Sequence, residues 1–208
     1  MRRIVSCVLM MALLCGCAAQ REESPEQAAA RLRTMYLAAE GCELSADITA
    51  EYGEQVFDFS VDARWMREGE TVVTITQPEL VAGITARIRE GETVLEYDGV
   101  GFSLGTLDES GLTPMSAIPG LLESISDGYM ARCSFVGEGD GRRLAVQFRD
   151  PDAGAGTGTE TEMLFDPVSG GLCRGEISVD GVRRLTVVCT RFTMEMTEHG
   201  AKSGENVG

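Results

Sequence analysis

The side chains that most often carry enzyme chemistry are sparse in this sequence. His199 is the only histidine, and it lies close to the C-terminal end. Serine and cysteine nucleophiles usually rely on a histidine base, and most catalytic zinc sites use histidine ligands. The sequence therefore argues against a catalytic triad and a histidine metal centre. We predict a non-catalytic protein without a metal or cofactor.

The acidic residues offer two weaker possibilities. Asp58 and Asp62 could act as glycosidase carboxylates, but the alternation around them places both on the solvent-facing side of a strand. The segment 150–162, DPDAGAGTGTETE, could hold a calcium ion, but it lacks EF-hand spacing and fits a flexible loop. Its GxGxG pattern is not followed by a helical pattern, so it does not predict a phosphate site.

Cysteine chemistry is predicted at the N-terminus instead. Arg2 and Arg3 precede an uncharged run, residues 4–14, that is too short to span about 30 Å of hydrocarbon and is typical of a secretory signal. The following LCGC resembles a bacterial lipobox, in which the final cysteine receives a diacylglyceryl thioether before cleavage. This resemblance implies a signal peptide over 1–16, a lipidated Cys17 and a tether over 17–23. Ordinary secretory cleavage near residues 17–19 is the alternative.

The charge of the chain agrees with anchoring through acyl chains. The sequence has 33 Asp and Glu against 18 Lys and Arg, a formal net charge of −15. Such a charge argues against nucleic acid as a partner and against docking on anionic lipid. We therefore expect a protein that is lipid-anchored to the cell membrane and lies on its extracytoplasmic face.

Four cysteines follow the lipobox, and the sequence leaves their redox state open. They are Cys42, Cys133, Cys173 and Cys189. The even count in an exported chain permits two disulfides, whereas buried free thiols are the alternative. A strict two-residue turn at 180–181 would place Cys173 and Cys189 on opposite strand faces. The hydrophobic pattern prefers an even register with both on one face, where a diagonal placement would still exceed bonding reach.

The remaining pattern predicts a helix followed mainly by strands. Ser24, Pro25 and Gln27 indicate a capped helix start, and Gly41 is expected to end the helix. Period-2 alternation begins at Cys42 and continues through about six strands separated by short glycine turns. Residues 113–128 then predict one or two short helices with a break at Pro119 and Gly120. About five more strands follow, and 197–208 is expected to be a disordered tail.

This order resembles the LolA/LolB-like superfamily of bacterial lipoprotein-handling and lipid-binding proteins. The local marks are TITQPELVAGITARI, then TVLEYDG, and late in the chain FDPVSGGLCRGEISVDG. The resemblance covers 24–196 and implies an α+β fold: an incomplete antiparallel β-barrel of about 11 strands, with an N-terminal helix and a short helical lid. The carrier member of the family is a soluble shuttle. The lipobox disfavours that role for this chain.

The resemblance also implies an apolar cavity that binds lipid or the acyl chains of lipoproteins. The residues expected to line it are Leu32, Tyr36, Phe57, Phe59, Trp65, Ile84, Ile88, Ile118, Leu122, Ile125, Phe148 and Phe165. A filled core would need the same apolar face, so the pattern alone does not separate a hollow interior from a packed one. The rival interpretation is a cargo-free adaptor that binds an envelope protein partner through a sheet edge or loops.

Overall fold

The structure is a computed structural model that describes residues 23–106 and 112–196. The predicted signal peptide (1–16), the lipidated Cys17 and the predicted tail (197–208) lie outside the described residues. Of the predicted tether, 17–23, only Glu23 is described.

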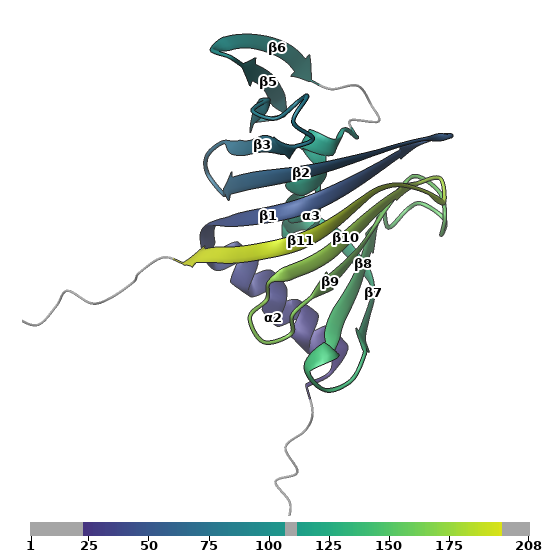
Figure 1. Cartoon of the computed structure of the whole chain (residues 1–208). Helices are drawn as coiled ribbons and strands as arrows, with labels where there is room; N and C mark the ends of the chain where they lie inside the picture. The colour runs from purple at the N-terminus through teal and green to yellow at the C-terminus, as the bar shows by residue number, and fades with distance from the viewer. Residues whose placement is uncertain (1–22, 107–111, 197–208) are drawn as a thin grey trace, which may run out of the picture.

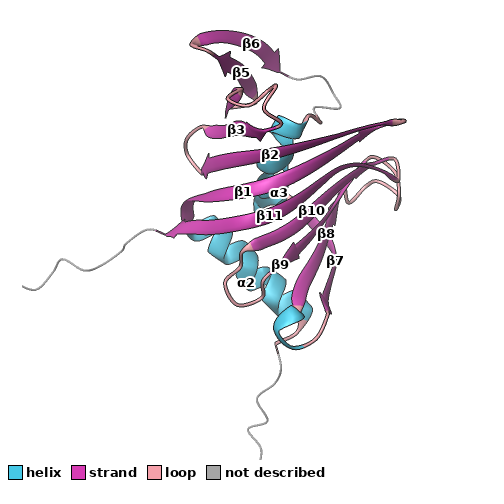
Figure 2. Cartoon of the chain, viewed as in Figure 1, coloured by secondary structure: helices cyan, strands magenta, loops and turns pink. Residues whose placement is uncertain are grey.

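One antiparallel sheet dominates the described part of the chain (Figures 1 and 2). The elements are α2 (Pro25–Ala38), β1 (Ala39–Tyr52), β2 (Gln55–Met66), β3 (Thr71–Gln77), β4 (Thr85–Arg89), β5 (Glu92–Tyr97), β6 (Val100–Thr106), α3 (Pro114–Asp127), β7 (Tyr129–Val136), a short 3-10 turn (Gly139–Gly141), β8 (Arg143–Arg149), β9 (Thr159–Phe165), β10 (Leu172–Val179) and β11 (Val182–Met196). The strand order is β6-β5-β4-β3-β2-β1-β11-β10-β9-β8-β7, so β6 and β7 are unjoined edges. The predicted α+β incomplete barrel is confirmed.

Helix α2 begins where the sequence predicts but ends earlier. The Ser24 hydroxyl accepts from the Gln27 amide, and the Gln27 side chain accepts from the Ser24 amide. The prediction that Gly41 ends the helix is wrong, because β1 already begins at Ala39. Gly41 is required for a different reason: a Cβ there would lie 2.4 Å from the Trp65 carbonyl oxygen on β2.

Helix α3 is continuous, so the predicted break at Pro119 and Gly120 is also wrong. Thr113 and Ser116 form its capping box, and Pro114 occupies the first turn. Pro119 costs the helix one backbone hydrogen bond. The helix stays intact because its apolar face is buried along its whole length. The buried residues of this face are Met115, Ala117, Ile118, Pro119, Leu121, Leu122 and Ile125.

Arginines from neighbouring elements satisfy the C-terminal carbonyls of both helices. Arg33 of α2 donates to the carbonyl oxygens of Ile125, at 2.9 Å, and of Gly128. Arg67 after β2 donates to the carbonyl oxygens of Ala39, at 2.9 Å, and of Tyr36. Carbonyls at a helix C-terminus lack intrahelical partners and attract positive charge. Arg33 thereby connects α2 to the end of α3.

Candidate functional site

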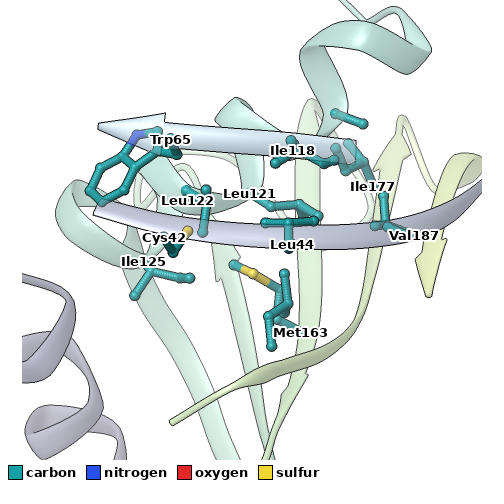
Figure 3. Close-up of a cluster of buried hydrophobic side chains, with 14 of the residues drawn as sticks. Cys42, Leu44, Trp65, Ile118, Leu121, Leu122, Ile125, Met163, Ile177 and Val187 are labelled. Atoms are coloured by element: carbon teal, nitrogen blue, oxygen red, sulfur yellow. The ribbon is translucent and has the colours of Figure 1, made fainter. Parts of the chain in front are cut away.

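Both helices lie on one face of the sheet, here called the concave face (Figures 1 and 3). Leu121 of α3 points at Gly175 of β10, where an added Cβ would lie 2.6 and 2.8 Å from its two methyl carbons. Figure 3 shows Leu121, Leu122 and Ile125 gathered with side chains of β1 and β9. The glycine therefore leaves the space that lets α3 approach the sheet closely.

The predicted cavity residues gather on this face, but with different burial. Eight of them belong to the buried core: Leu32, Tyr36, Trp65, Ile118, Leu122, Ile125, Phe148 and Phe165. Phe59, Ile84 and Ile88 are partly buried and pack against it. Phe57 shares the face, because it pairs with the buried Ala50, yet it is 42% exposed. That these residues line a binding site stays a prediction.

The centre of the concave face is filled by α3. Ile118, Leu121, Leu122 and Ile125 each have 0% exposed surface. A void large enough for water would leave part of these side chains accessible, so the interface between α3 and the sheet is packed. A ligand reaching this centre would have to displace the helix.

The apolar face continues beyond the area that α3 covers. One row of paired residues runs across the sheet from Leu44 through Ala63, Val73, Ala86 and Leu95 to Phe102. Burial along the row changes from 0% exposed at Val73 and Ala86 to 60% exposed at Phe102. On the same face Tyr97 is 51% and its partner Val100 is 53% exposed. Tyr97, Val100 and Phe102 are called the apolar patch below.

The opposite face of the same strands is mainly polar, and it carries no contiguous group of exposed aromatic residues among the described side chains. Arg87 of β4 forms ion pairs with Glu70, at 2.8 Å, and with Glu96, at 3.2 Å. Apolar residues on this outer face are dispersed: Val94 pairs with Arg87 and Ser103, Val72 pairs with Arg64 and Arg87, and Val56 pairs with Glu51. Three contiguous exposed apolar residues on one face are typical of a binding surface rather than of singly scattered surface hydrophobics.

A second group of exposed aromatic side chains lies at the β1–β2 hairpin. The rings of Tyr52 and Phe57 are 6.3 Å apart. The Tyr52 hydroxyl donates to the Leu112 carbonyl oxygen at 3.2 Å, in the segment that leads into α3. This hydrogen bond joins the hairpin to the approach to the helix.

The acidic residues considered for catalysis make structural contacts. Asp58 accepts a hydrogen bond from Thr49 at 2.8 Å, and Asp62 accepts one from Ser45 at 2.6 Å. Both pairs join β1 to β2 on the outer face, as the alternation predicts. Within residues 23–106 and 112–196, no three His, Cys, Asp or Glu side chains are grouped as metal ligands would be.

The cysteines of the described residues are free thiols, and burial lowers the reactivity of two of them. Burial raises the pKa of Cys42 and of Cys189 to about 12. Thiolate is the reactive form, so these two groups are weak nucleophiles at neutral pH. Burial likewise raises the pKa of Tyr36, whose hydroxyl donates to the Gly170 carbonyl oxygen at 3.1 Å.

Sequence reasoning missed the apolar patch and Gly175. A signal for the patch was present, because a two-residue turn at 98–99 pairs Tyr97 with Val100 and Leu95 with Phe102. The alternation therefore assigns these residues to one face. No sequence signal distinguishes Gly175 from glycines that serve turns.

None of the helices in the described ranges is both long and apolar enough to span a membrane. The fold and the site define an open antiparallel half-barrel with a helix packed on its concave face. No family model matches the chain, and no curated protein matches it.

Solved structures of similar shape include members of the superfamily that the sequence resembles. A LolA superfamily protein from Nitrosomonas europaea has 8% identity and a TM-score of 0.42, covering 84% of this chain and 94% of its own. An uncharacterized conserved protein from Thermus thermophilus has 10% identity and a TM-score of 0.48, covering 83% and 90%. At these identities and TM-scores the likenesses carry no functional conclusion.

Proposed function

We propose that this protein is a membrane-anchored lipoprotein of the extracytoplasmic face that binds an acyl chain, of a lipid or of another lipoprotein, and catalyses no reaction. The bound chain lies on the concave face of the half-barrel. The observation that carries the proposal is the apolar patch, where the inward-facing row of the sheet emerges from beneath α3 and remains exposed.

An acyl chain suits this surface chemically. It offers only apolar area, and the apolar patch offers aromatic and branched side chains, with no charged residue among the described side chains on the same face of β5 and β6. Burying one such side chain stabilises a complex by about 1.5–3 kcal/mol. The chain could extend toward the centre only by displacing α3, so α3 acts as the predicted lid.

The adaptor remains the second candidate because of two specific observations. The centre of the concave face is packed, and β6 is a sheet edge without a partner strand in the described part of the chain. An unpaired edge can add a strand from a protein partner. In that case the apolar patch would contact a partner's side chains.

Two measurements, native mass spectrometry and a fatty-acid binding assay with a Phe102 variant, distinguish acyl-chain binding from the adaptor function. Residues 18–208, exported to a bacterial periplasm, should carry a stoichiometric adduct in native mass spectrometry that extracts as lipid. Phe102→Gln should weaken binding of a fluorescent fatty acid about tenfold or more, since it removes apolar contact area. Val94→Gln is the matched control, because Val94 is exposed on the opposite face, and should change affinity less than about twofold.

Other results would count against the proposal. If the folded protein shows only the mass of the ligand-free chain after incubation with lipids and with acylated peptides, acyl-chain binding is excluded and the adaptor function is favoured. Equal losses of affinity in both variants would mean that the bound chain does not lie on the apolar patch.

A further inference from the structure

Two half-buried thiols, Cys173 of β10 and Cys189 of β11, lie on neighbouring strands. The register of β10 and β11 pairs Gly175 with Val187 and Arg174 with Val188. Continued one step further along both strands, this register would place Cys173 opposite Cys189. Directly opposed residues of an antiparallel pair have Cα atoms about 4.5–5.5 Å apart, within the roughly 4.4–6.8 Å that a disulfide spans. Both cysteines line the same surface pocket of about 420 Å³.

A bulge in the hairpin produces this arrangement. Val179 pairs with Val182 across a two-residue turn, and that register alone would place the cysteines on opposite faces. The register then shifts by one residue between Ile177 and Ser178. The shift changes the pairing to the even register that the hydrophobic pattern prefers, and continuing that register would make the two cysteines direct rather than diagonal neighbours.

The other described cysteines lie too far away to compete. Cys133 is on β7, and β8 and β9 separate it from β10, which at about 4.8 Å per strand amounts to about 14 Å. Cys42 on β1 pairs with Met194, whereas Cys189 pairs with Ala46. Four residues along a strand span about 13 Å. Cα atoms more than about 7 Å apart cannot be bridged without backbone movement.

We infer that Cys173 and Cys189 form a cross-strand disulfide when the protein is in an oxidising environment. The Cys173 thiolate attacks one sulfur of a small disulfide oxidant, such as oxidised glutathione, and expels one glutathione thiolate. The Cys189 thiolate then attacks the Cys173 sulfur of the mixed disulfide and expels the second. The two cysteines lose two electrons and two protons in all, and these reduce one oxidant disulfide to two thiols.

The order of attack follows from the surroundings of the two thiols. Burial raises the pKa of Cys189 to about 12, so its thiolate is scarce. The β9–β10 register shifts between Leu172 and Arg174, which leaves Cys173 without an opposed residue on β9. Pairing with β9 therefore does not hold Cys173 in one position. Cys173 is therefore the first nucleophile. The disulfide is independent of what the concave face binds.

Peptide mapping tests the pairing. The purified full chain is equilibrated in a buffer of reduced and oxidised glutathione, its free thiols are alkylated, and it is digested with trypsin. The four cysteines fall in separate peptides, with Cys173 in 150–174 and Cys189 in 185–191. We expect these two peptides to be joined, and reduction to lower the melting temperature by about 5 °C.

Serine variants make the test specific. Cys173→Ser should abolish the joined peptide and the response of the melting temperature to reductant, whereas Cys133→Ser, the matched control, should preserve both. Far-UV circular dichroism checks that each variant is folded. The inference is overturned if both cysteines are alkylated in the oxidising buffer while the protein is folded, or if Cys189 is joined to Cys42 or Cys133 instead.

Discussion

Gly175→Val is expected to destabilise the domain by about 1–3 kcal/mol, because it places a branched side chain where Leu121 of α3 packs. Leu121 is fully buried, so it cannot turn into solvent to relieve the clash. The helix must therefore move away from β10, which loosens the packed centre of the concave face. Urea unfolding of the purified domain measures the change in free energy.

Two comparisons identify the cause of that loss. Gly101→Val on β6 is the matched control, because its nearest neighbour would be Val94 Cγ1 at 3.8 Å, and it should change stability by less than about 0.5 kcal/mol. Leu121→Ala alone should cost about 2–5 kcal/mol, and its added cost in the Gly175→Val background should be smaller by about 1 kcal/mol, because the clash is then already relieved. Strictly additive effects would contradict the proposed contact between α3 and β10.

Cys17→Ser is expected to abolish labelling by an alkyne fatty acid fed to the cells and to release the protein from the membrane fraction. A serine cannot form the diacylglyceryl thioether, and the acidic chain offers no basic patch to replace it. The measurement is fractionation of cells that express the full chain, followed by detection of the attached alkyne.

The neighbouring Cys15→Ser is the control for this prediction. It changes a cysteine in the same LCGC stretch while keeping a small residue before the lipidated position, so labelling should persist. If the chain without any substitution carries no label and is released into the medium or periplasm, residues 1–16 belong to an ordinary secretory signal, and the lipid anchor is excluded.

The strands were predictable because most of them have one solvent-facing side and one buried side. Alternation such as Asp58, Ser60 and Asp62 against Phe57, Phe59 and Val61 marks a strand locally. Gly41 and Pro119 were misread because their roles depend on distant contacts. Gly41 is required by the Trp65 carbonyl, and the helix around Pro119 is held by burial against the sheet.

The sequence predicted which residues face the candidate site but not which of them are exposed, again because exposure depends on distant contacts. Alternation places Val73 and Phe102 on the apolar faces of their strands, but it does not say which of them the fold buries. Coverage depends on where α3 lies, which Gly175 and Arg33 fix from other elements. The Ile177/Ser178 bulge, which decides the cysteine pairing, likewise has no sequence mark.

Photolabelling tests acyl-chain binding on the concave face most directly. Folded residues 18–208 would be irradiated with a fatty acid that carries a diazirine on its chain, and tandem mass spectrometry would locate the label. We expect label on Tyr97, Val100 and Phe102, and its loss when unlabelled lipid is added in excess. Label on the outer face around Val94, or no label that unlabelled lipid can displace, would contradict acyl-chain binding at this site.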